Sequence, residues 1–185
     1  MISVKELSFK FALSALLLCL GLGAEDVQTS TKVAEQKKVP YIQVSSVVSQ
    51  FPTMANRTVN FEQVDGSSQI DFAENKNIVI KQTGTYFILA VGQIGAEKTG
   101  DMGYVDLWFE RNGKEIPSSG SRQSIASDKL TAVVISQSVI ELNAGDTLSV
   151  GFGTNKSGLG LVAFKRVQQE LSIPSIVLTI NKLDY

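Results

Sequence analysis

The sequence of 185 residues has no histidine and a single cysteine, Cys19. Without histidine, neither a Ser-His-Asp triad nor a Cys-His pair can form, and the usual zinc ligand sets are missing. Cys19 lies in an apolar run near the N-terminus, so removal of that run would leave no thiol for a disulfide or a metal. Hydrolysis by two carboxylates is the enzymatic alternative that these absences leave open.

A strong charge of either sign is also missing, since the formal net charge is −1 at pH 7. Surfaces that bind nucleic acid carry a clear excess of lysine and arginine, so we expect no nucleic-acid partner. No glycine-rich loop stands between a strand and a helix, which argues against a phosphate-binding loop. Hydrophobic residues make up 43% of the chain and charged residues 19%, as is typical of a globular domain.

Residues 1–24 have the three parts of a secretory signal peptide. Lys5 and Lys10 give a basic start, residues 11–22 form an apolar core, and Gly21–Ala24 supply small residues for cleavage. A transmembrane anchor is the alternative, but a span needs about 20 apolar residues and this run is shorter. The sequence therefore predicts an exported protein with a cleaved signal peptide.

Lipid anchoring at Cys19 is a weaker interpretation of the same segment, because Leu18 stands where lipoprotein processing needs a small residue. Residues 25–40 are polar and have neither a collagen repeat nor a heptad pattern, so they predict a flexible tail. No later run is long enough to span a membrane. We therefore expect a secreted or cell-surface domain over residues 41–185.

From residue 41 the sequence changes to short runs that alternate or are rich in β-branched residues. These runs cover residues 41–49, 59–61, 70–72, 77–81, 84–95, 104–111, 130–142, 147–153 and 175–183. Asn112-Gly113 and Asn143–Asp146 are turn sequences. Residues 159–171 are ambiguous, although their glycines favour strand and loop over helix. Because no segment has a convincing helical period, the sequence predicts an all-β fold, a sandwich or jelly roll.

The run at residues 84–95 is apolar almost throughout, which is typical of a strand buried on both faces. Such a strand packs on a sheet on one side and needs a second apolar partner on the other. That partner could be an opposing sheet of the same chain or a second copy of the protein.

Four sequence pieces, in this order, resemble the complement C1q/tumour-necrosis-factor superfamily over about residues 41–185. They are Gly84–Tyr86 at the head of an apolar strand, Leu107–Gly113 with its Asn-Gly turn, Leu142–Val150 with its Gly-Asp turn, and the apolar strand at 175–183. The resemblance implies a jelly roll of about ten antiparallel strands that assembles as a homotrimer and is not an enzyme. The collagen-like stalk that is common in C1q-type proteins is missing.

In this family the strand that begins Gly-x-Tyr lies near the threefold axis, so the resemblance implies subunit contacts at Tyr86, Ile88 or Leu89. An inner strand of a monomeric sandwich is the alternative. The alternating run 104–111 suggests a second surface, since Tyr104, Asp106 and Trp108 share the face opposite its apolar residues. Aromatic side chains beside a carboxylate favour a ligand platform or an interface. A single amphipathic tryptophan covered by a loop is the plainer interpretation.

No cofactor is expected, and calcium is the one metal that the sequence leaves open. Glu97 and Asp101 in one loop could supply the hard oxygen ligands that calcium prefers. The most favoured function is an exported homotrimeric recognition module that binds a protein, glycan or surface ligand. The alternatives are a structural surface-coat or adhesin-type protein and, less favoured, a carbohydrate-active enzyme on a β-sandwich.

Overall fold

The computed structural model describes residues 38–53, 57–98, 102–127, 130–165 and 172–183, all of them within one compact unit, Gln36–Tyr185. The regular elements of these residues are β-strands that pair antiparallel, so the predicted all-β fold is confirmed. In this part of the chain no helix is long and apolar enough to cross a membrane. The predicted signal peptide and nearly all of the predicted tail lie outside the described residues.

The first sheet is built around the longest strand, β5, which pairs with β9 along one side and with β14 along the other. From β14 the sheet continues through β1 to β2, and β11 pairs with the last residues of β5. Its strands are β1 (Tyr41–Ser46), β2 (Gln63–Ser68), β5 (Gly84–Ala96), β9 (Ala132–Leu142), β11 (Leu159–Leu161) and β14 (Ile176–Lys182).

The second sheet runs in the order β3, β4, β10, β6, and the short strands β7 and β8 both pair with β6. Its strands are β3 (Ile70–Ala73), β4 (Asn77–Ile80), β6 (Gly103–Arg111), β7 (Lys114–Glu115), β8 (Ser121–Ile125) and β10 (Thr147–Thr154). The segment around Thr58 bridges to Gly151 and so continues the sheet beside β10. A separate two-stranded ribbon joins β12 (Phe164–Lys165) to β13 (Ser172–Ile173).

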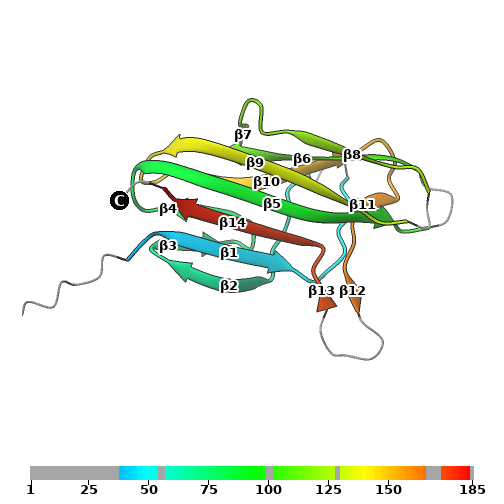
Figure 1. Ribbon diagram of the computed structural model, residues 1–185, viewed down its shortest axis with the longest axis horizontal. Helices are drawn as coiled ribbons and strands as arrows, with labels where there is room; N and C mark the ends of the chain where they lie inside the picture. The colour runs from blue at the N-terminus through cyan, green and yellow to red at the C-terminus, as the bar shows by residue number, and fades with distance from the viewer. Residues whose placement is uncertain (1–37, 54–56, 99–101, 128–129, 166–171, 184–185) are drawn as a thin grey trace, which may run out of the picture. The chain divides into compact units, whose positions relative to one another are not determined.

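The two sheets form the layers of a β-sandwich, with β9, β5, β14, β1 and β2 in the layer nearer the viewer in Figure 1. Alternate residues of each strand point into the space between the layers, as the pleat requires. The core holds Ile42, Val44, Tyr86, Ile88, Leu107, Phe109, Val150, Phe152, Leu178 and Ile180, among others. The candidate sites described below therefore lie on the outward faces of the two sheets.

Strand β5 is buried on one face and half-exposed on the other, which corrects the prediction of a strand buried on both faces. Tyr86, Ile88 and Ala90 point into the core, whereas Phe87, Leu89 and Val91 alternate with them. The opposing sheet covers the inward residues of β5. It is therefore not the second apolar partner that the sequence predicts for the outward face of this strand.

Both predicted turns are present. Asn112 and Gly113 have φ values of 53° and 73°, the left-handed conformation that an Asn-Gly hairpin turn between β6 and β7 requires. The turn at Asn143–Asp146 joins β9 to β10 and contains Gly145 with φ 94°. In the ambiguous stretch 159–171, the described residues form β11 and the first part of the β12–β13 ribbon, with no helix.

Candidate functional site

The residues predicted to make subunit contacts lie on opposite faces of β5. Tyr86 and Ile88 are 0% and 1% exposed, and the Tyr86 hydroxyl donates a hydrogen bond of 2.7 Å to the carbonyl of Gln82. Both side chains are enclosed by their own chain, so of the three residues that the resemblance suggests, these two lie in the core. Leu89 points outward and stays a candidate, together with its outward neighbour Phe87.

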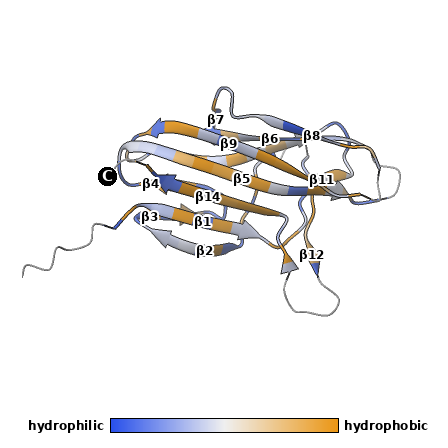
Figure 2. Cartoon of the chain, viewed as in Figure 1, coloured by the Kyte–Doolittle hydropathy of each residue, from blue (hydrophilic) through white to orange (hydrophobic). Residues whose placement is uncertain are grey.

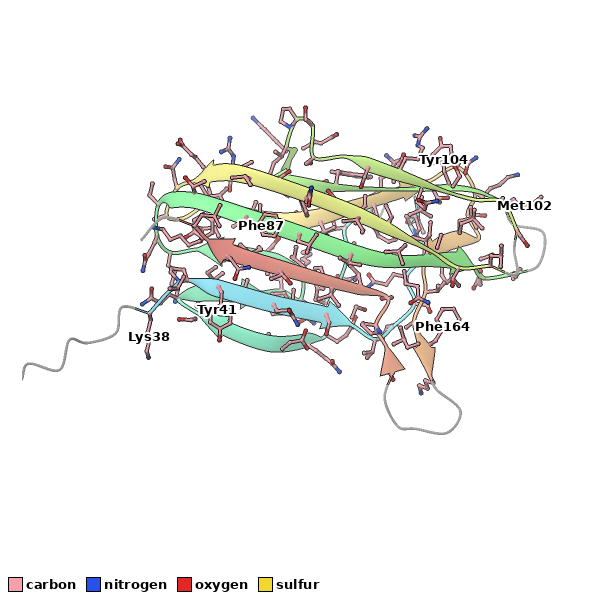
Figure 3. The ribbon with its side chains drawn as sticks, in the orientation of Figure 1. Lys38, Tyr41, Phe87, Met102, Tyr104 and Phe164 are labelled. Carbon is pink, nitrogen blue, oxygen red and sulfur yellow. The ribbon has the colours of Figure 1, made fainter. Side chains whose placement is uncertain are left out.

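An apolar surface runs along the outward faces of β9 and β5, is interrupted by Gln137 on β9, and reaches one residue of β14; we call it the apolar band. On β9, the side chains of Val133, Ile135 and Val139 are 50%, 52% and 60% exposed. The pairing register places them beside outward residues of β5, which in turn adjoin β14. The band consists of Phe87, Leu89, Val91, Val133, Ile135, Val139 and Val177. Figure 2 shows hydrophobic colour along β9 and β5, and Figure 3 labels Phe87 there.

The rest of the same sheet face is polar, so the band has a clear edge. On β1, Gln43 donates to Asp65 of β2 and accepts from the hydroxyl of Thr179. Ser45 donates a hydrogen bond of 3.0 Å to the same Asp65 carboxylate. An antiparallel sheet that faces water normally carries such polar side chains across its whole outward face.

The outward face of the second sheet carries a polar cluster at one end of β6. The guanidinium of Arg122 on β8 donates two hydrogen bonds, of 2.7 and 2.9 Å, to the two carboxylate oxygens of Asp106. The same guanidinium lies 3.6 Å from the centre of the Tyr104 ring, in a cation–π contact. The hydrogen bond to Asp106 raises the pKa of Arg122 above its ordinary value. Figure 3 labels Tyr104 near β8.

Trp108 lies on this outward face, two residues further along β6, and its ring rests on glycines of β10. Gly151 is its cross-strand partner, and a Cβ atom at that position would overlap the indole. A Cβ atom at Gly153 would lie 3.4 Å from the ring, so the indole spans both glycines. The indole N–H donates a hydrogen bond of 3.0 Å to Glu110, which fixes the ring orientation.

Two open hollows flank the tryptophan. The first, of about 440 Å³, is lined by Arg57, Asp106, Leu107, Trp108, Glu115, Gly120, Ser121 and Arg122. The second, of about 390 Å³, is lined by Phe51, Pro52, Thr53, Arg57, Gly153, Thr154, Asn155, Lys156 and Ser157. Arg57 belongs to both hollows and so connects them. The predicted surface of Tyr104, Asp106 and Trp108 is therefore one polar and aromatic face, and Trp108 lines the first hollow.

The predicted calcium loop is only partly described, because Asp101 lies outside the described residues while Glu97 is exposed. Among the residues that the structure describes, no three histidine, cysteine, aspartate or glutamate side chains are grouped closely enough to hold a metal ion.

Sequence reasoning did not find Arg57, Arg122 or Gly151, which complete the face around Trp108. No local pattern marks them, because they reach it through the pairing of β8 and β10 with β6 and through the bridge at Thr58. Comparison with known proteins adds no family: no family model matches the chain, and no curated protein matches it significantly.

Proposed function

We propose that this chain is an exported, non-catalytic recognition module that works as a homotrimer, with a jelly-roll domain like that of the C1q/tumour-necrosis-factor superfamily. The apolar band is the single observation that carries the proposal. Its three most exposed members, Val133, Ile135 and Val139, are each at least half exposed on one strand of a single chain. Contiguous apolar surface of this kind marks an interaction site.

The order of the strands supports the jelly-roll part of the proposal. Along the chain, β1 and β2 belong to the first sheet, β3 and β4 to the second, and β5 to the first again. After the β6–β8 group, the chain crosses to β9, back to β10 and finally to β14, which lies between β1 and β5. Repeated crossing between two antiparallel sheets is the arrangement of double-sheet jelly rolls.

The position of the band supports self-association. It lies on β9, an edge strand of the first sheet, and on the neighbouring β5, and it ends where the polar outward residues of β14 and β1 begin. Stable interfaces have an apolar centre with a polar rim, and the band has polar residues beside it on β1. In a ring of three, each subunit makes the same two contacts with its neighbours, and residues beside the threefold axis meet their own copies.

The experiment introduces a charge into the band. Leu89→Asp and Val139→Asp each place a carboxylate in the apolar contact, where its desolvation is uncompensated, so both variants should dissociate to monomers at micromolar concentration. Size-exclusion chromatography with light scattering gives the mass. Val64→Asp is the matched control, because Val64 is 49% exposed on β2, outside the band.

The control variant should keep the mass of the wild-type assembly. If Leu89→Asp and Val139→Asp also keep that mass and stay folded by circular dichroism, the apolar band is not the interface and the proposal fails. Because Val139 is exposed in the single chain, its substitution does not disturb the subunit core, and a change in mass reports assembly rather than misfolding.

A further inference from the structure

From the face around Trp108 we infer that each subunit binds an acidic oligosaccharide, a sugar chain with carboxylate or sulfate groups. This inference rests on the proposed recognition role, but not on the trimer, since the face lies on the sheet opposite the apolar band. Three features support it: a fixed aromatic platform, an arginine with no side-chain partner among the described residues, and a carboxylate acceptor beside an open hollow.

The platform is Trp108, which is half-buried and held from two directions. One face of the indole rests on the backbone of Gly151 and Gly153, and the ring lines the larger hollow. Its N–H is already satisfied by Glu110, whose other carboxylate oxygen accepts from Ser149 at 3.3 Å. A ring held in this way presents apolar area at little entropic cost. The C–H face of a pyranose is the flat, weakly apolar surface that suits it.

The acidic group is inferred from the cations of the two hollows. Arg122 is committed to Asp106 and Tyr104, so it is not free for a ligand. Arg57 lines both hollows beside the tryptophan, and within the described part of the chain nothing accepts a hydrogen bond from its guanidinium or pairs with it. An arginine fork binds a carboxylate or sulfate in two-point geometry. Lys156 adds a second cation at the smaller hollow.

The remaining polar groups fit the hydroxyls of a sugar. Glu115 lines the larger hollow with an exposed carboxylate, whereas the hydroxyl of Ser121, which also lines it, already donates to the carbonyl of Ile135. Carboxylates accept hydrogen bonds from hydroxyl donors, which every sugar ring offers on its edge. The face therefore offers a stacking surface, an anion-binding arginine and acceptors for hydroxyl groups, the few well-placed polar groups that a small-ligand site uses.

The test uses Trp108 as its own reporter, because it is the one tryptophan of the chain. Three tetrasaccharides are titrated into the wild-type protein: an oligogalacturonate, a sulfated heparin fragment and neutral maltotetraose. We expect the tryptophan emission to change with at least one acidic probe, and calorimetry should give about tenfold tighter binding for that probe than for the neutral one. The acidic probe that binds more tightly shows whether the site prefers carboxylate or sulfate groups.

Two variants locate the site. Arg57→Gln should weaken binding of the acidic probe about tenfold and remove the preference over the neutral probe, whereas Lys165→Gln, which removes an exposed cation on β12, should change neither. Trp108→Ala, followed by calorimetry, should lose binding. Because this variant also removes packing on β10, its fold is checked by thermal melting. Arg57→Gln tests the same site without changing that packing.

Equal binding of neutral and acidic probes, or unchanged binding by Arg57→Gln, would overturn the inference, as would the absence of binding by all three. The monomeric Val139→Asp variant separates this failure from failure of the proposed assembly. It should bind the acidic probe with the same affinity per chain as the wild type, so loss of the trimer and loss of the sugar site are distinguishable.

Discussion

Trp108 is held by residues that lie far from it in the sequence. Gly151 and Gly153 let the indole lie against the backbone of β10, and Glu110 fixes its N–H. At both positions any larger side chain meets the ring, most severely at Gly151. The ring of Trp108 can lie against β10 only because Gly151 and Gly153 have no side chain.

Gly151→Ala tests this arrangement. The new methyl group would overlap the indole, so the ring must move outward, and overpacking of this kind costs about 1–3 kcal/mol. We expect a lower midpoint of urea unfolding and a red shift of tryptophan emission, as the ring gains contact with water. Gly120→Ala is the control, because a Cβ atom there meets no neighbour within 4 Å. An unchanged emission spectrum for Gly151→Ala would show that the ring does not rest on this glycine.

At the scale of elements, the sequence predicts the apolar strands well and the polar strands poorly. The runs at 84–95 and 104–111 alternate or are strongly apolar, and they become β5 and β6 with nearly the predicted bounds. Strands β2 and β8 have sequences rich in serine, glutamine and charge, so no local pattern marks them. Their conformation comes from pairing with β1 and β6, which only the folded chain provides.

The candidate site divides in the same way. Alternation along β6 places Tyr104, Asp106 and Trp108 on one face, and this could be predicted because the period of a strand is two residues. On β5 the same period places Tyr86 and Phe87 on opposite faces. Because both faces of the run are apolar, the sequence does not show which of the two residues points into the core. That choice depends on register with β9 and β14, which turns Tyr86 and Ile88 into the core and leaves Leu89 outward.

The turn between β9 and β10 connects to the neighbouring hairpin through Asp146. Its carboxylate accepts hydrogen bonds from the backbone N–H of Asn143, at 2.9 Å, and from the side-chain amide of Asn112, at 2.7 Å. These bonds stabilise the charged form and lower the pKa of Asp146 below its ordinary value. The two turns are therefore tied together by an ionised carboxylate.

The pH dependence of stability tests this link. Because the folded pKa of Asp146 lies below the unfolded one, its stabilising contribution is complete above the unfolded value and is lost as the pH falls through the folded value. Asp146→Asn should therefore lower the free energy of unfolding by about 0.5–1 kcal/mol near pH 7, a modest amount because the turn faces solvent. The difference between variant and wild type should begin to shrink below about pH 4 and continue to fall as the pH passes the lower pKa of folded Asp146. Urea unfolding at pH 7 and pH 3 measures both differences, and a gap that does not shrink at low pH would exclude the charge as its cause.

At the scale of the whole molecule, the two outward faces of the sandwich differ in character. The first sheet presents the apolar band, and the second presents the Trp108 face with its Arg122–Asp106 pair and with Arg57. A module that assembles through one layer keeps the other available for ligand. On our proposal, three copies joined through the band would display three sugar sites and gain avidity for a polymeric glycan.

The measurement that tests the assembly most directly is the mixing of subunits. Two forms of the chain, with tags of different mass, are unfolded together, refolded at micromolar concentration and weighed by native mass spectrometry. A homotrimer gives two pure and two mixed trimers, because copies assemble at random through identical surfaces. The account predicts this pattern for the wild type. Two monomer masses without mixed species, or a single mixed dimer between two pure ones, would contradict it.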